Sequence, residues 1–181
     1  MGPINFDVQQ GEILFIVGSN GSGKTTLLKL ITGLYPPLKG IIQINSQPVN
    51  IAQFNYIFSA VFSDFHLFER LHHSPQIDST NINKYLQMMS LDQKVSWKEN
   101  KFSTIKLSSG EKRRLALVIA LIEDKPVYIF DEFASDQDPK FTKYFYQTII
   151  QDLKNDNKIV IVVTHDKRYF NCADKVLVLS S

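Results

Sequence analysis

Three short apolar runs without polar alternation constrain the fold of this 181-residue chain more than any other feature. They are Ile13–Val17, Val127–Phe130 and Ile159–Val163. A strand with one face in water alternates apolar and polar residues, so unbroken runs of this length predict strands buried on both faces, as in a parallel sheet. We therefore predict an α/β fold with a mostly parallel sheet.

Polar residues capable of chemistry follow each of the three runs. Gly18–Thr26 follows the first, Asp131 and Glu132 follow the second, and Thr164–Asp166 follows the third. In open parallel α/β sheets, ligands bind at the carboxyl ends of the strands. The sequence therefore predicts a single site at this edge of the sheet.

The rest of the chain has patterns typical of helices, further strands and an insert. Residues 65–106 are more polar and richer in turn-forming residues, around one short helix at Ile82–Met89. We expect this stretch to be a small helical subdomain, inserted into a sheet domain that spans residues 1–181. Outside it we expect helices at Lys24–Thr32, Gly110–Glu123 and Phe141–Lys154, and strands at Lys39–Asn45 and Phe54–Phe62.

Composition excludes several classes of protein. The formal net charge of +2 provides no electrostatic footprint for nucleic acid. Cys172 is the single cysteine, so no internal disulfide forms, and an unreactive small side chain is the simpler reading. The longest strongly apolar run, Leu115–Ile122, is far shorter than the about 20 residues that span a bilayer. We expect this fragment to be soluble and cytosolic, with any membrane domain lying outside the chain.

Gly18–Thr25, with the sequence GSNGSGKT, fits the phosphate-binding pattern GxxxxGK[ST]. Glycines let consecutive backbone N–H groups wrap around phosphate oxygens, and the following helix N-terminus adds positive potential. Lys24 is expected to reach the β- and γ-phosphates of ATP, and the Thr25 hydroxyl to ligate Mg²⁺. A chance glycine-rich turn is the alternative, but the preceding strand and following helix favour the functional reading. The predicted ATP-binding residues are Gly18, Ser19, Asn20, Gly21, Ser22, Gly23, Lys24, Thr25 and Thr26.

The acidic pair Asp131 and Glu132 ends the second apolar run. We expect Asp131 to hold Mg²⁺, directly or through water, and Glu132 to act as general base on the attacking water. An acidic turn after a buried strand is the alternative. His165 is either an ordinary histidine at a strand end or a residue that contacts the γ-phosphate.

Two further polar residues have a purely structural alternative. Ser108 and Glu111 have the spacing of a capping box, which would only start a helix. The same helix N-terminus, with the Ser108 hydroxyl and the Gly110 amide, also forms a phosphate cradle. Asp138 precedes Pro139, so it fits a helix N-cap followed by proline at the first helical position, or a nucleotide contact.

Taken together, these motifs resemble the nucleotide-binding domain of ABC transporters over nearly the whole chain. GSNGSGKT resembles Walker A, LSSGE the family signature, VYIFDE Walker B, SDQD the D-loop and VVTHD the switch-histidine motif. The stretches FSAVFSDFHLF, LSSGEKRRLAL, FDEFASDQDP and THDKRYFNCADKV are similar to the exporter branch that moves cyclic peptides and peptide siderophores.

The resemblance implies a P-loop ATPase that works as a pair at the cytoplasmic face of the cell membrane. Two copies would pack head to tail, with each ATP between Gly18–Thr26 of one copy and Ser108 and Gly110 of the other. Lys24, Glu132 and His165 would be catalytic, and hydrolysis would reopen the pair and drive a fused or separate transmembrane domain.

The chain departs from the family pattern at several positions. Ser109 stands where the signature usually has glycine, and Glu111 where it has glutamine. Ser63, followed by Asp64, stands at the position of a glutamine that helps to bind Mg²⁺, and serine is too short for that contact. Only 17 residues precede Gly18, too few for the usual adenine-stacking aromatic residue. We therefore expect weak nucleotide affinity, and a trimmed exporter fragment or a naturally short subunit.

Two other functions remain open at this point. The altered signature and Ser63 are compatible with a nucleotide-binding interaction module of the ABC type that hardly hydrolyses ATP. A non-transport ABC ATPase of translation or DNA maintenance shares these motifs, but such proteins carry tandem cassettes or a long coiled-coil insertion.

Overall fold

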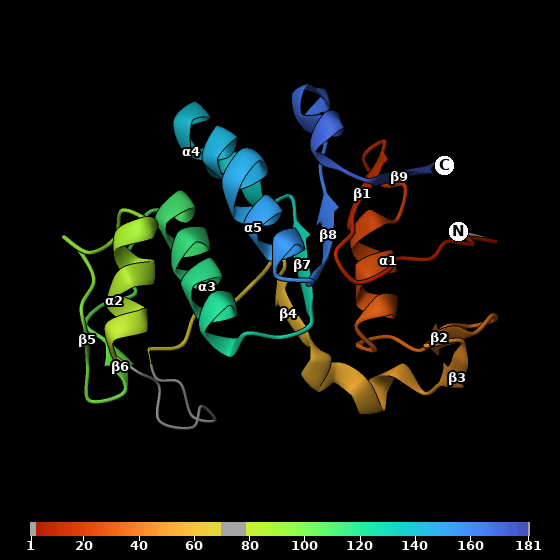
Figure 1. Cartoon of the computed structure of the whole chain (residues 1–181), viewed down its shortest axis with the longest axis horizontal. Coiled ribbons are helices and arrows are strands. Elements are labelled where there is room, and N and C mark those ends of the chain that lie inside the picture. The colour runs from red at the N-terminus through yellow and green to blue at the C-terminus, as the bar shows by residue number, and fades with distance from the viewer. Residues whose placement is uncertain (1–2, 70–78, 181) are drawn as a thin grey trace. The chain divides into compact units, whose positions relative to one another are not determined.

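Figure 1 shows the computed structural model of the chain, which describes residues 3–69 and 79–180. The chain divides into two compact units, residues 1–62 with 125–181, and residues 63–124. The second unit is wider than the insert expected at 65–106, because it includes the helix expected at Gly110–Glu123.

The first unit is built on a five-stranded sheet in which every pairing is parallel. Its strand order is β4-β7-β8-β1-β9. The three apolar runs form β1, β7 and β8, and their side chains are almost entirely buried, which confirms the predicted fold class. The five strands are β1 (Ile13–Gly18), β4 (Phe58–Val61), β7 (Val127–Asp131), β8 (Ile159–Val163) and β9 (Lys175–Leu179).

The register of this sheet brings the polar strand ends together. Val163 of β8 pairs with Ile16 of β1 on one side and with Asp131 of β7 on the other. The residues that follow these positions, Gly18, Glu132 and Thr164, therefore lie at the same edge of the sheet. This edge is the carboxyl edge that the sequence predicts as the site.

The long helix expected at Phe141–Lys154 is interrupted by a π-helical turn. It consists of α4 (Pro139–Tyr144), the π turn Phe145–Ile149 and α5 (Ile150–Asn155). The wider turn lets the adjacent Phe145 and Tyr146 both face the interior, where they are 0% and 1% exposed. Helix α1 (Lys24–Ile31) follows β1 as predicted and packs on β1 and β7.

The two further predicted strands are shorter than expected, and they belong to two different sheets. β2 (Ile42–Ile44) pairs with β3 (Gln47–Val49) in a separate antiparallel ribbon. The expected strand at Phe54–Phe62 begins only at Phe58, since a 3₁₀ helix covers Ile51–Ile57. The Asn50 side chain accepts a hydrogen bond from the backbone of Ala52 and starts this helix, so its first residues are not extended.

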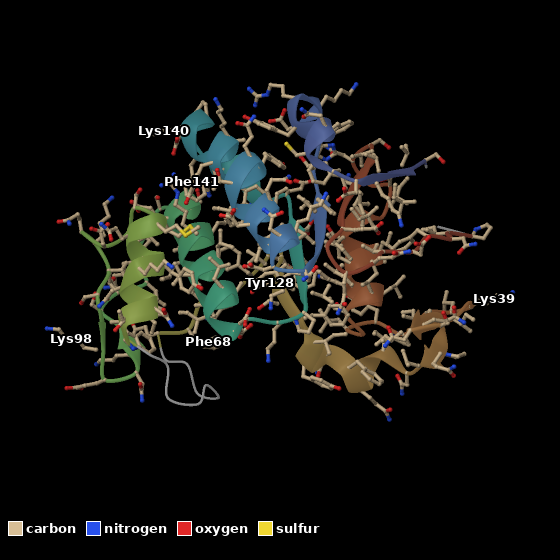
Figure 2. The ribbon with its side chains drawn as sticks, in the orientation of Figure 1. Lys39, Phe68, Lys98, Tyr128, Lys140 and Phe141 are labelled. Carbon is tan, nitrogen blue, oxygen red and sulfur yellow. The ribbon has the colours of Figure 1, made fainter. Side chains whose placement is uncertain are left out.

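The second unit is mainly helical. It contains α2 (Ser79–Met88), α3 (Ser109–Glu123) and a short hairpin of β5 (Trp97–Lys98) and β6 (Lys101–Phe102). Helix α2 packs against α3, and the rings of Trp97 and Phe102 contact each other with centroids 4.7 Å apart. Figure 2 shows the exposed Lys98 of this hairpin pointing outward. None of the helices within residues 3–69 and 79–180 is long and apolar enough to cross a membrane.

Candidate functional site

The loop between β1 and α1 has a backbone shape that favours glycine. Gly23, the residue before α1, has φ 90° in the left-handed region, and no side chain caps the helix. A Cβ on Gly18 would lie 2.4 Å from the backbone oxygen of Leu179 and 2.7 Å from Ser22 Oγ. The end of β1, where the loop begins, therefore packs directly against β9. The N-terminus of α1 has no side-chain cap, which leaves amide groups for an anion.

Lys24 lies inside this loop and is only 6% exposed. Its Nζ donates to the backbone oxygens of Gly18 at 3.1 Å and of Ser19 at 2.9 Å. The Ser22 hydroxyl is also buried and has no hydrogen-bond partner among the described residues. A buried ammonium and a buried donor hydroxyl in a glycine-rich loop fit the phosphate oxygens of ATP.

Thr25 and Asp131 meet beneath the loop. Thr25 Oγ1 donates to Asp131 Oδ2 at 2.9 Å, and Asp131 is 1% exposed. A hydroxyl beside a carboxylate is an oxygen donor set that fits Mg²⁺. No group of three or more His, Cys, Asp or Glu in the described part of the chain forms a metal site. The Thr25–Asp131 pair itself provides two oxygen ligands, and phosphate and water would supply the others of a bound Mg²⁺.

Glu132 follows β7 in a left-handed conformation, with φ 50°. Its backbone N–H bonds to the oxygen of Val163, and the 3₁₀ helix Phe133–Asp136 follows it. Glu132 Oε1 lies 2.9 Å from Nε2 of His165, and the two side chains are 38% and 44% exposed. A carboxylate and an imidazole in hydrogen-bond contact, both open to solvent, are suited to orient and deprotonate a water molecule.

Two neighbouring cavities open at this edge of the first unit, and Glu132 lines both. The first has a volume of about 410 Å³, and it brings together Asn20, Gly21, Gly23, Lys24, Thr25, Thr26 and Glu132. The second has a volume of about 280 Å³ and is lined by Glu132, Ala134, Ser135, Tyr146, Thr164, His165 and Asp166. Most of the site residues predicted on the sheet therefore share one cavity, and His165 reaches it through Glu132.

Asp138 lies outside both cavity linings and has the structural role that the sequence allowed. It is the N-cap of α4, and its Oδ1 accepts a hydrogen bond of 2.9 Å from the backbone of Phe141. Pro139 occupies the first helical position, as its fixed φ favours. A contact between Asp138 and nucleotide stays a prediction.

Ser108 caps α3 within the second unit. Its Oγ accepts a hydrogen bond from the Glu111 backbone at 3.4 Å, and the Glu111 carboxylate bonds to Ser108 N at 3.0 Å and to Ser108 Oγ at 2.9 Å. Lys94 forms an ion pair with the same carboxylate. Lys94 and then Ser108 lower the pKa of Glu111 to about 2. Both readings of Ser108 remain, because this capped N-terminus also carries Gly110.

The second cavity contains two buried polar residues, Thr164 and Tyr146, to which the sequence assigned no specific role. Thr164 is 3% exposed, and it directly precedes His165 in the THD motif, so the sequence already placed the two residues side by side. Tyr146 carried no signal beyond its apolar helix face, yet its hydroxyl lies 2.7 Å from Thr164 Oγ1. Burial raises the pKa of Tyr146 to about 12, so the hydroxyl keeps its proton at neutral pH.

A family model described as "ABC transporter" matches residues 1–135. The ATP-binding protein SyrD of Pseudomonas syringae pv. syringae is 41% identical over 189 residues, covering 99% of this chain and 33% of SyrD. The energy-coupling factor transporter ATP-binding protein EcfA1 of Mycoplasma pneumoniae is 31% identical over 195 residues, covering 98% of this chain and 69% of EcfA1. The chain thus spans about a third of the length of SyrD.

Solved structures have the same fold. A bacterial Atm1-family ABC exporter with ATP bound superposes with a TM-score of 0.81 at 23% identity, over 97% of this chain and 33% of that one. The dimeric ABC transporter cassette MJ0796 superposes with a TM-score of 0.78 at 23% identity, over 97% of this chain and 84% of that one.

Proposed function

The chain belongs to the ABC transporter family as an ATP-binding ATPase domain, and on that premise we propose that it powers export across a membrane. The observation that carries the proposal is that one cavity is lined by Lys24, Thr25 and Glu132. Lys24 is buried in its glycine loop, Thr25 bonds to Asp131, and Glu132 bonds to His165.

Each group has a distinct role in this proposal. Lys24 and the loop amides bind the β- and γ-phosphates and favour charge that develops on them during transfer. Glu132 accepts a proton from the attacking water, and the His165 imidazole holds Glu132 and the water in register. The left-handed φ of Glu132 is strain of the kind that the surrounding structure stabilises at functional sites.

Mg²⁺ is the cofactor that the donor set favours. We propose that Thr25 and Asp131 hold it, with the remaining ligands supplied by phosphate oxygens and water. When bound, the ion neutralises charge on the transferring phosphate. The two residues already contact each other at 2.9 Å, so the chain presents both donors on the same side of the loop.

We also propose that two copies act together, head to tail, as the family resemblance implies. Each ATP would lie on Gly18–Thr26 of one copy and against Ser108 and Gly110 of the other, with Asp138 near the shared site. MJ0796 is described as a dimeric cassette, which supports pairing without specifying its geometry here. The α3 N-terminus, with its amide groups and dipole, has the chemistry for this contact.

Export is the finer part of the proposal. This chain covers a third of SyrD and a third of the Atm1-family exporter chain, which leaves room for a membrane domain in the same polypeptide. We propose that residues 65–106 form a helical insert within the ATPase domain, and that the membrane domain lies outside residues 1–181. The cargo would be a cyclic peptide or a peptide siderophore, and the domain would act at the cytoplasmic face of the cell membrane.

The test removes hydrolysis and follows association. Glu132→Gln should abolish ATP turnover while ATP binding persists, because the amide cannot accept the proton. Light scattering should then show an ATP-dependent shift from monomer to dimer. If the Glu132→Gln variant keeps the ATP turnover of the wild type, the assigned role of this carboxylate is contradicted.

One observation favours a second candidate, a nucleotide-binding module with little hydrolysis. The Ser108 hydroxyl and the Glu111 carboxylate already bond to each other, so a phosphate must compete with an internal anion. In such a module, Glu132→Gln would leave the low turnover nearly unchanged. The same measurement therefore separates the two functions.

A further inference from the structure

Hydrogen bonds hold the turn that carries His165 on both sides of the histidine. Thr164 Oγ1 accepts the backbone N–H of Asp166 at 3.1 Å, which closes a short side-chain turn around His165. The Asp166 carboxylate in turn accepts hydrogen bonds from Nε and Nη2 of Arg168, at 2.8 and 2.6 Å. His165 is thus the residue of this turn whose side chain points instead to Glu132.

Tyr146 anchors this turn to the interior. Its hydroxyl and Thr164 Oγ1 are 2.7 Å apart, and both side chains are buried. Its ring stacks on Tyr169, with centroids 4.4 Å apart and planes 14° from parallel, and meets Phe15 of β1 edge-on at 5.7 Å. The Arg168 guanidinium lies 5.6 Å from the Tyr169 ring, so the same network also holds the residues after the turn.

The π-helical turn is the reason that Tyr146 reaches this position. A regular helix buries one stripe, and the stripe that contains Phe141 and Phe145 would leave the next residue at its border. The extra residue in Phe145–Ile149 widens the turn, and Phe145 and Tyr146 are both buried. Single π turns inside helices occur frequently at functional sites.

We infer that Tyr146 is a positioning residue for His165. The Tyr146 hydroxyl fixes Thr164 at the start of the turn that presents the His165 imidazole to Glu132. This inference rests on the proposed function, in which His165 and Glu132 act in hydrolysis. Tyr146 touches neither phosphate nor water in this scheme. It acts through the position of the histidine, 2.9 Å from the glutamate.

Tyr146→Phe is the central test, because it removes the hydroxyl and keeps the buried, stacked ring. We expect kcat for ATP to fall about tenfold while the Kd for ATP stays unchanged, since small displacements of catalytic groups cost up to about a hundredfold in rate. Thr164→Val should reproduce the fall, and Thr164→Ser, which keeps the oxygen, should recover most of the activity. Tyr144→Phe, on the same helix and half-buried, is the matched control and should leave kcat unchanged.

A double-mutant cycle separates positioning from general destabilisation. In a His165→Ala background, Tyr146→Phe should have no further effect on kcat, because the group that it positions is gone. Full additivity of the two changes, or a wild-type kcat in folded Tyr146→Phe, would overturn the inference.

A readout independent of activity distinguishes this inference from the proposed function. Hydrogen exchange of the Asp166 amide, which bonds to Thr164 Oγ1, should be about fivefold faster in Tyr146→Phe, as expected for about 1 kcal/mol of lost hydrogen bonding. The Glu132 amide, bonded to Val163, should not change. A wild type without ATP turnover would contradict the proposed function. In that case, unchanged Asp166 exchange would overturn the inference, and faster exchange would support Tyr146 as the anchor of the turn.

Discussion

Helices α1 and α3 begin in opposite ways, although the resemblance assigns a phosphate contact to both. Helix α1 begins after Gly23, which has no side chain to cap it, and its first turn contains no acidic residue. Helix α3 begins after Ser108 with a complete capping box, and Glu111 stands in its first turn. The first helix leaves its N-terminal amides to a ligand, whereas the second satisfies part of them from its own side chains.

The difference lies in which group supplies stability to each helix end. In α1 the loop is held by close packing on β9 and by Lys24, so the cradle persists with its amides open. In α3 the Glu111 carboxylate occupies the neighbourhood that a phosphate would use, and Lys94 offsets its charge. The loop of α1 thus has open amides for an anion, whereas the end of α3 is capped by its own side chains. In the proposed phosphate contact, α3 would have to exchange this internal partner for the ligand.

The largest expected effect is at the open cradle. Lys24→Met should lower ATP turnover by about 10² to 10³, because it removes the buried charge that we propose contacts the transferring phosphate. Steady-state phosphate release measures it. Lys39→Met, at an exposed lysine that points outward in Figure 2, is the control. Similar losses in the two variants would show that Lys24 has no special place in the cradle.

Packing of the same loop is the next test. Gly18→Ala should lower the free energy of unfolding by about 3 kcal/mol, the upper end for overpacking, since its Cβ would meet the Leu179 backbone at 2.4 Å. Gly21→Ala meets no atom within 4 Å and should cost only about 1 kcal/mol, from its left-handed φ of 80°. Urea unfolding compares the two variants. Equal losses would mean that contact with β9 does not hold the loop.

The closed cap of α3 should give a smaller change in stability. Ser108→Ala should lower the unfolding free energy by about 1 kcal/mol, because the α3 N-terminus loses its cap. Ser108→Asp retains a capping oxygen, but it cannot donate to the Glu111 carboxylate as the Ser108 hydroxyl does, and it adds negative charge where the phosphate would bind. If Ser108→Asp dimerises with ATP as well as wild type, in the Glu132→Gln background, the contact with Ser108 is refuted.

The smallest effect concerns acid stability. The folded pKa of Glu111, about 2, lies below its ordinary value of 4.5, so its contribution is complete above pH 4.5 and is lost as the pH falls toward 2. Glu111→Gln retains the capping-box geometry and should flatten the pH dependence of unfolding between those values. Unfolding by urea at several pH values measures this slope. An unaltered slope would show that another carboxylate dominates it.

Much of the first unit was predictable because its signals are local. A strand that is buried on both faces lacks polar alternation. A parallel sheet is therefore predicted from two local segments alone, Ile13–Val17 and Ile159–Val163. The glycine loop and the acidic pair follow such strands directly, and the carboxyl ends of parallel strands share one edge. Accordingly, Lys24, Thr25 and Glu132 line one cavity, and His165 contacts Glu132. Their roles in binding and hydrolysis stay predictions.

Other elements were not predictable, because distant groups or competing local bonds decide them. Phe54–Ile57 has residues suited to a strand, but the side chain of Asn50 starts a 3₁₀ helix there. The spacing of Ser108 and Glu111 allowed a cap or a cradle, and the structure shows that the cap is formed. Its use as a cradle depends on a second molecule, which no local pattern contains.

The sequence by itself determined the parallel sheet, the glycine loop and the type of residue at each strand end. These depend on side-chain burial and backbone freedom over a few residues, which are properties of short segments. Only the tertiary structure decided that Tyr146 joins the turn of His165. That contact links residues 18 positions apart through a π turn, and the free energy that favours it comes from packing against β1 and Tyr169.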